Sequence, residues 1–200
     1  MSGHLYCAAI AARCNLLPTR VRGTQGKSRE GRNRNCDCDC CGPAQFETLS
    51  HISQVCPRAW GPRNRRHNII ADQLARCLEK KGYTVIKETK IPSSRGNFKP
   101  DLIAFTDQLA VVIDVTVSAD NLREPNSAHF EKVEKYSTVK EISTFVEVNS
   151  GFQLSYLALA VNWRGILSPQ SAQDMKNLGL TNHELKLLSM ITVEQMAIIH

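Results

Sequence analysis

The chain has 200 residues, of which 42% are hydrophobic, so it can fill the core of one ordinary domain and carry a small appendage. No apolar run approaches the roughly 20 residues that cross a bilayer, and the run Leu5–Ala12 lacks the basic flank of a secretory signal. These features exclude a membrane partner and a disulfide-stapled secreted scaffold, and we expect an intracellular protein with reduced thiols.

The formal net charge of +6 is concentrated in the first third of the chain. Residues 1–66 contain eleven Lys and Arg against four Asp and Glu, whereas residues 67–200 contain fourteen against fifteen. A segregated basic segment is typical of proteins that bind a phosphate backbone, although a solvated tail has the same composition. The side chains that we expect to contact nucleic acid are Arg20, Arg22, Arg63, Arg65, Arg66 and His67.

Four zones follow one another along the chain. Residues 1–35 are predicted to be a basic, partly disordered arm, because their second half is too polar to bury. Residues 36–58 contain a cysteine cluster with the spacing of a zinc knuckle. Residues 63–165 have the periodicity of a globular core, and residues 166–200 are predicted to be a C-terminal helical extension.

The core pattern predicts the order α-β-β-β-α-β, followed by two helices. Apolar positions recur at helical spacing up to Gly82, and Ser168 and Thr181 are predicted to cap the last two helices. Strands are predicted at 83–88, 101–105, 109–117 and 154–161, a loop at 92–97 and one helix at 127–142. The run 109–117 is apolar on both faces, which indicates a central strand. A helix between two strands implies a parallel crossover, so we expect an α/β fold around a mixed sheet.

Cys38, Cys41, His51 and Cys56 have the spacing of zinc ligands. The pair Cys38 and Cys41 forms a tight chelating turn, and a short helix over 47–55 would bring the other two to the same ion. Four protein ligands leave no open coordination position, so this zinc would be structural and would supply folding energy. The ligand register stays open, because Cys36 can replace Cys38 and Cys40 can replace Cys41.

Asp101 begins one predicted strand and Asp114 interrupts the next, within the apolar run 109–117. A lone buried charge there would be costly. If the strands form a hairpin, both carboxylates meet at one end of the sheet and can bind magnesium, which polarises a phosphate and generates hydroxide. The alternative for Asp114 is a strand-edge aspartate whose carboxylate is satisfied by backbone amides. The alternative for Asp101 is the ordinary turn chemistry of Lys99-Pro100-Asp101.

Further groups could complete such a site. Lys132 and Lys135, on the following helix, could stabilise the phosphate, and Glu88 could extend the metal shell. His67 could cap, contact phosphate or take part in the chemistry. Alternatively, Lys132, Lys135 and Glu88 are ordinary solvated surface residues.

Several motifs together resemble one known family. They are 15–20 (Asn-Leu-Leu-Pro-Thr-Arg), the Cys-x2-Cys-Gly…His51…Cys56-Pro57 cluster, Arg66-His67-Asn68, Lys99-Pro100-Asp101, Asp114-Val-Thr-Val, Lys132-x2-Lys135-Tyr136 and Trp163-Arg-Gly165. In this order they resemble the restriction-like endonuclease region of site-specific non-long-terminal-repeat retrotransposons, which insert into ribosomal RNA genes. The resemblance covers nearly the whole chain.

The resemblance implies a PD-(D/E)xK nuclease fold and nicking of a target DNA duplex in the nucleus, where the freed 3′ end primes reverse transcription. Asp101 and Asp114 would match the metal-binding acids. Thr116 stands where the usual lysine would be, so Lys132 or Lys135 would inherit its role. Element RNA and a reverse transcriptase domain would be partners in the full polyprotein, of which this chain would be a C-terminal piece.

Two other function classes remain open from the sequence. One is a catalytically inactive, zinc-containing nucleic-acid-binding remnant, since phosphate contacts need no active site. The other is a zinc-stabilised protein–protein adaptor, which would have no affinity for nucleic acid.

Overall fold

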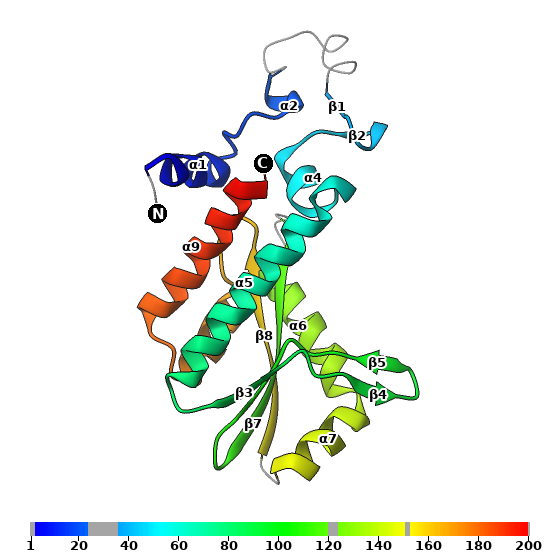
Figure 1. The fold of residues 1–200 in the computed structure, drawn as a ribbon, viewed down its shortest axis with the longest axis vertical. Coiled ribbons are helices and arrows are strands. Elements are labelled where there is room, and N and C mark those ends of the chain that lie inside the picture. Colours follow the sequence, from blue (N-terminus) through cyan, green and yellow to red (C-terminus); the bar gives the residue numbers. More distant parts are fainter. Residues whose placement is uncertain (1–2, 24–35, 120–123, 151–152, 200) are drawn as a thin grey trace.

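A four-stranded sheet with the strand order β3-β6-β7-β8 forms the centre of the molecule (Figure 1). The structure, a computed structural model, describes residues 3–23, 36–119, 124–150 and 153–199. The strands of this sheet are β3 (Thr84–Lys87), β6 (Leu102–Phe105), β7 (Leu109–Ser118) and β8 (Gln153–Asn162). Two short hairpins are formed by β1 (Asp37–Cys38) with β2 (Gly42–Phe46), and by β4 (Ile91–Ser93) with β5 (Gly96–Phe98).

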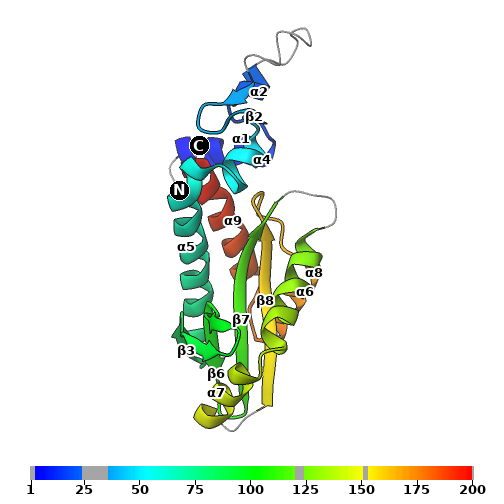
Figure 2. The same ribbon diagram turned by 90° about the vertical axis from the view of Figure 1, so that its right-hand side faces the viewer.

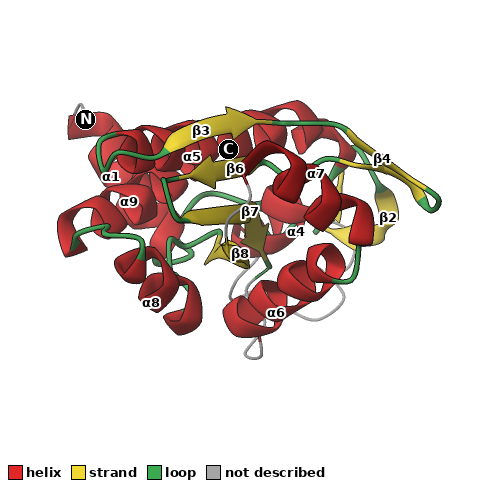
Figure 3. Cartoon of the chain, turned by 90° about the horizontal axis from the view of Figure 1, so that it is seen from below, coloured by secondary structure: helices red, strands yellow, loops and turns green. Residues whose placement is uncertain are grey.

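Helices cover both faces of the sheet. They are α1 (Gly3–Arg13), α2 (Arg20–Gly23), α4 (Leu49–Gln54), α5 (Trp60–Glu79), α6 (Glu124–Ser137), α7 (Lys140–Ser150), α8 (Pro169–Asn177) and α9 (Asn182–Ile199), with a 3-10 turn η1 (Pro57–Ala59) before α5. The edge-on view shows α5 and α9 on one face and α6 on the other (Figure 2). The view along the strands shows α8 and α9 on the opposite side from α6 and α7 (Figure 3).

Strand pairing confirms an α/β fold with a mixed sheet. β6 pairs antiparallel with β3 and with β7, whereas β8 runs parallel to β7 over ten residue pairs. The parallel pairing requires a crossover, which α6 and α7 supply. β7 has a strand on each side and is the central strand that its two-sided apolar pattern predicted.

Alternation along the strands divides the core into two apolar layers. Leu102, Ile113 and Leu159 pack with side chains of α5, α8 and α9, whereas Ile103 and Val112 pack with those of α6 and α7. Both sheet faces are therefore covered, which explains why β7 and β8 are apolar on both sides.

The caps of the last two helices agree with the prediction. Ser168 Oγ accepts a hydrogen bond from Ser171 N at 3.2 Å, with Pro169 in the first turn of α8. Thr181 Oγ1 accepts from Glu184 N at 3.2 Å, and a Glu184 carboxylate oxygen accepts from Thr181 N at 2.7 Å. This reciprocal pair is a capping box, and it fixes where α9 starts.

Two predictions of local structure were wrong. Residues 127–142 form two helices rather than one, with the junction of α6 and α7 at Thr138 and at the buried Val139, which is 1% exposed. Residues 92–97 lie in the β4–β5 hairpin rather than in a loop; Gly96 has a φ of +112°, which a side chain would disfavour. In addition, α5 begins at Trp60, before the predicted start of the core.

The first part of the predicted basic arm contains regular structure. α1 packs on α9, and Ala12 and Met196 share a small apolar cluster with the buried Trp163. The remainder of the arm, residues 24–35, lies outside the described residues. Among the helices that the structure does describe, none is long and apolar enough to cross a membrane.

Unequal strand lengths shape the end of the sheet. β6 starts at Leu102, which pairs with Ile113 of β7. β7 continues to Ser118, and over 115–118 its partner within the sheet is β8 alone. The backbone edge on the β6 side of this overhang must be satisfied by other groups.

Candidate functional site

A groove of about 460 Å³ opens where β6 begins and β7 continues beyond it. Residues of the N-terminal turns of α5 line one side and residues of α6 line the other; the two helices are labelled in Figure 1. The charged side chains along it are Arg63, Arg66, Lys99, Asp101, Asp114, Lys132 and Lys135, beside His67. Basic groups outnumber acids in the groove, so its surroundings favour a polyanion even though its floor carries carboxylates.

The hairpin of β6 and β7 brings the two predicted acids together. Leu102 pairs with Ile113, so the next opposed pair along the same antiparallel register is Asp101 and Asp114. Opposed residues of an antiparallel pair point to the same face of a sheet. Both side chains line the groove and both are largely buried, with 15% and 5% of the side chain exposed.

Asp101 is tied to the β7 edge and to α5. Its Oδ2 accepts a hydrogen bond from Val115 N at 2.7 Å and lies 3.1 Å from His67 Nε2. The hydrogen bond to Asp101 raises the pKa of His67 to about 9, against the opposing effect of burial. His67 is thus a positively charged partner of Asp101. Asp101 thus accepts a backbone amide hydrogen, the kind of contact that was the alternative expected for Asp114.

Asp114 is held from α6. Tyr136 donates its hydroxyl hydrogen to Oδ1 at 2.7 Å, and Lys132 Nζ lies 2.8 Å from Oδ2. Oδ2 is buried and, apart from this ion pair, has no hydrogen-bond partner among the described residues. Burial and the charge of Asp114 raise the pKa of Tyr136, so its hydroxyl remains a donor. Tyr136 belongs to the motif Lys132-x2-Lys135-Tyr136, but no role was predicted for it from the sequence, although it lies one helical turn after Lys132 and faces the same way.

The two candidate lysines differ in position. Lys132 is partly buried and forms the ion pair with Asp114. Lys135 is exposed at the rim, where its Nζ donates to the Tyr136 hydroxyl at 3.3 Å and lies 4.6 Å from the ring centroid. Lys132 therefore touches an acid directly, whereas Lys135 reaches the groove through Tyr136.

Glu88 lies apart from the pair of acids. It forms an ion pair with Lys99 at 2.8 Å, and 57% of its side chain is exposed. It lines a neighbouring hollow with His67 and Asp101, but not the groove that contains Asp114. No contact between Glu88 and Asp114 supports a role for Glu88 as an additional metal ligand.

The basic residues expected to meet nucleic acid are dispersed. Arg63 lines the groove, whereas Arg65 is exposed outside it. Arg66 also lines the groove, but it is only 2% exposed and donates to Ser53 O at 3.2 Å, so it joins α5 to α4. Arg20 forms an ion pair with Asp39, and neither Arg20 nor Arg22 lines the groove.

The donor set of the groove fits a hard divalent cation. Two opposed carboxylates in a largely buried position repel each other, and His67 and Lys132 each contact only one of them. Asp114 Oδ2 retains unused acceptor capacity, and Lys132 supplies the only positive charge that touches it among the described residues. Magnesium prefers such oxygen ligands, so Asp101 and Asp114 are the residues that would hold it.

Cys38, Cys41, His51 and Cys56 form a second cluster, whose ligand atoms lie within 4.8 Å of one another and which could hold a metal such as zinc. Cys38 Sγ is 3.7 Å from Cys56 Sγ, and Cys41 Sγ is 3.4 Å from His51 Nε2. Burial and the neighbouring thiols raise the pKa of Cys41 to about 12. A divalent ion would reverse this effect by stabilising the thiolates.

Local structure selects these donors from the five cysteines of the segment. Cys38 lies on β1 and is 1% exposed, and Gly42 follows the chelating pair with a φ of +68°. His51 lies on α4, whose first turn is capped by Thr48. Cys36 is also buried but stands outside the cluster, and Cys40 is exposed.

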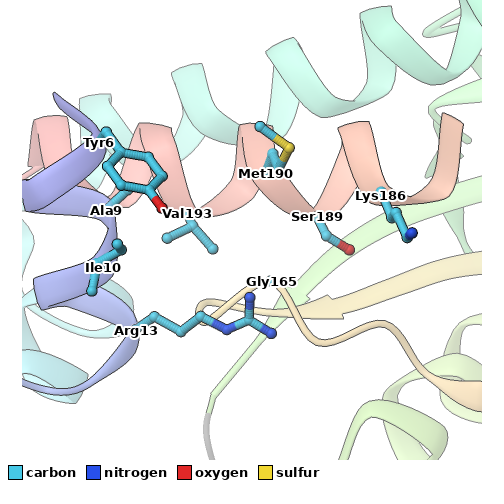
Figure 4. A pocket seen from close by; sticks show the side chains of 9 residues that line it. All are labelled: Tyr6, Ala9, Ile10, Arg13, Gly165, Lys186, Ser189, Met190 and Val193. Atoms are coloured by element: carbon cyan, nitrogen blue, oxygen red, sulfur yellow. The ribbon is translucent and has the colours of Figure 1, made fainter. Parts of the chain in front are cut away.

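Two other features have less chemical capacity. A hollow of about 490 Å³ between α1, α9 and the loop at Gly165 is mainly apolar (Figure 4). Of the described residues that line it, Arg13 and Lys186 are charged and none is an acid or a cysteine. Elsewhere, His129 lies 3.1 Å from Ser171 Oγ and 3.4 Å from an Asp174 carboxylate oxygen. This resembles a hydrolytic triad, but all three residues are buried, so the arrangement is structural.

The fold and the two clusters define an α/β protein with an acid-containing basic groove beside a Cys/His segment. Its homologues are Pol polyproteins of R2 retrotransposable elements. It is 34% identical over 184 residues to the "Retrovirus-related Pol polyprotein from type-2 retrotransposable element R2DM" of Drosophila melanogaster. Type-1 element R2 polyproteins of Nasonia vitripennis and Popillia japonica are 33% and 32% identical over 181 and 190 residues.

These alignments cover 90%, 88% and 94% of the chain, but only 17%, 17% and 38% of the respective relatives. The chain therefore corresponds to a segment of these polyproteins. No protein-family model matches it.

Proposed function

We propose that the chain is a metal-dependent DNA endonuclease segment of an R2-type retrotransposon polyprotein, with a fold of the PD-(D/E)xK type. The observation that carries the proposal is the opposed pair Asp101 and Asp114 in a groove with excess basic charge. The similarity to Pol polyproteins supports a substrate that is nucleic acid. Nicking of target DNA would provide a 3′ end for reverse transcription, and it requires the polyprotein to act in the nucleus.

The residues of the groove have different roles in the proposed reaction. Asp101 and Asp114 would hold magnesium, which polarises the scissile phosphate and lowers the pKa of a bound water. Tyr136 orients Asp114 through its hydroxyl hydrogen bond. Lys132 reaches the same carboxylate from α6, so its ammonium is positioned to offset charge that develops on the phosphate. His67 fixes Asp101 on the α5 side.

The Cys/His cluster would hold structural zinc and fix the geometry of α4 and η1. Through Arg66 and Ser53, α4 is joined to the wall of the groove. We infer that zinc supports the groove mechanically and takes no part in hydrolysis, because four protein ligands leave no coordination position for a substrate.

A plasmid-nicking assay of Asp114→Asn tests the proposal. Nicking of supercoiled DNA should fall by at least about a hundredfold, because the variant loses a ligand charge while keeping its shape, whereas DNA affinity should change only a few-fold. Asp107→Asn, at the exposed turn between β6 and β7, is the matched control and should nick normally. Equal nicking by the wild-type chain and Asp114→Asn would refute the assignment. Tight, salt-dependent DNA binding without any nicking by the wild-type chain would instead indicate an inactive nucleic-acid-binding remnant.

A further inference from the structure

Trp60 is an exposed aromatic side chain at the edge of the candidate active groove. It is the first residue of α5, 65% of it is exposed, and it lines the same groove as Asp101 and Asp114. Tryptophan is rarely left this exposed without a binding partner, because its burial is among the most favourable of all side chains. The other tryptophan, Trp163, is 1% exposed and belongs to the core.

The neighbours of Trp60 identify the chemistry of the partner. Arg63, one turn further along α5, also lines the groove and has no ion-pair partner within the described parts of the chain. Lys99 and Lys135 are exposed along the same groove. A nucleotide has a flat base, which can stack on the indole ring of Trp60, and an anionic phosphate, which can contact the exposed or unpaired cations around it.

We propose that Trp60 is a stacking platform for a nucleobase next to the phosphodiester that is cut, with Arg63 contacting the adjoining phosphate. This inference rests on the proposed nuclease function and adds that the DNA substrate should be partly unpaired. In continuous duplex DNA both faces of each base are covered by its neighbours, so an indole can stack only where a base is unpaired, splayed or terminal. The groove should therefore favour DNA with unpaired nucleotides at the cut site.

The position of Trp60 is fixed by the fold rather than left to a mobile loop. Only η1 separates it from Cys56, a member of the Cys/His cluster, and Ala59 within η1 is 2% exposed. On the other side it continues directly into α5, which packs against the sheet and α9. An aromatic group held on a rigid element loses little conformational entropy on binding a base.

Tryptophan fluorescence tests the proposal without any cutting step. The zinc-loaded full chain carrying Asp114→Asn would be titrated with a thymidine oligonucleotide of about twelve residues, without added magnesium, since single-strand sites span roughly 4–16 nucleotides. Stacking should quench the emission of Trp60, whereas the buried Trp163 should be insensitive. In the Asp114→Asn chain, the additional change Trp60→Ala should weaken affinity for the single strand roughly 5- to 100-fold, because a base–aromatic stack contributes about 1–3 kcal/mol. The same change should alter affinity for a continuous duplex of equal length by less than about threefold. Trp60→Phe should retain most of the affinity.

Phe130→Ala is the matched control, because Phe130 is an aromatic residue of α6 that is 58% exposed and does not line the groove. Its binding should equal that of the Asp114→Asn parent. Absence of quenching, or equal loss of single-strand and duplex affinity in Trp60→Ala, would overturn the stacking role. Either result would leave the nicking assay intact, so failure of this inference is distinguishable from failure of the nuclease assignment.

Discussion

The two ligand clusters of the chain differ in donors and in exposure. The Cys/His cluster offers three thiols and one imidazole, with no carboxylate among the described residues that form it. The groove offers two carboxylates, with a lysine, a tyrosine and a histidine attached to them and open volume alongside. Soft donors in a closed set suit an ion that holds structure, whereas hard donors beside open space suit an ion that must admit substrate.

The same contrast is seen in the two histidines. Burial lowers the pKa of His51, which keeps its imidazole neutral and able to coordinate a metal. Hydrogen bonding to Asp101 raises the pKa of His67 to about 9, which keeps it charged and bound to a carboxylate. His51 is therefore suited to bind a metal, whereas His67 is suited to position a carboxylate that binds one.

The largest effect should come from breaking the Cys/His cluster. Cys56→Ser should reduce bound zinc from about one ion per chain to near zero and should expose residues 36–56 to proteolysis, because the ion supplies their folding energy. Metal analysis and limited proteolysis would measure both. Cys40→Ser, which alters an exposed thiol outside the cluster, should keep the zinc. Full zinc content in Cys56→Ser would contradict the ligand assignment.

A second comparison separates the lysines. Lys132→Met should slow nicking about a hundredfold, because it removes the cation that contacts Asp114. Lys135→Met should have a smaller effect, since its amine is exposed and contacts the acid only through Tyr136. Single-turnover nicking at saturating DNA is the measurement, with circular dichroism to verify folding. If Lys135→Met were the slower of the two, the roles given to these lysines would have to be exchanged.

The smallest effect concerns stability against pH. Because the folded pKa of His67 lies above the ordinary value of 6.5, its contribution is fully present below pH 6.5 and is lost as the pH rises through about 9. Allowing for partial exposure, this amounts to about 1 kcal/mol. Urea unfolding of the wild-type chain and His67→Gln, without added magnesium, should show a difference that shrinks between pH 6.5 and 9. A constant difference would mean that His67 is neutral when folded.

Much of the fold followed from patterns that act locally. Apolar runs on both faces predicted β7 as a central strand, and Ser168 and Thr181 predicted the starts of α8 and α9, because caps depend on side chains only three residues away. The junction at Val139 was missed because the buried positions Tyr136, Val139 and Ile142 keep helical spacing across it, so the apolar pattern contains no sign of a break.

The candidate site was predictable in its residues but not in its contacts. Two aspartates on successive strands suggested a hairpin that would bring them together, and the register does so. The choice of Cys38 and Cys41 over Cys36 and Cys40 depends on which thiols the hairpin of β1 and β2 brings next to His51 and Cys56, and spacing alone cannot fix that. Likewise, the charge pattern could not distinguish the buried Arg66 from the partly exposed Arg63 and the exposed Arg65.

The overhang of β7 beyond β6 has a consequence for self-association. An uncovered strand edge can recruit a strand from another molecule and start aggregation. Here Asp101 occupies Val115 N and His67 lies against Val115 O, so the groove residues themselves block the exposed edge. Substituting Asp101 would therefore expose an unpaired strand edge that promotes association, as well as remove an acid. A substitution of Asp114 is for this reason the better test of the chemistry.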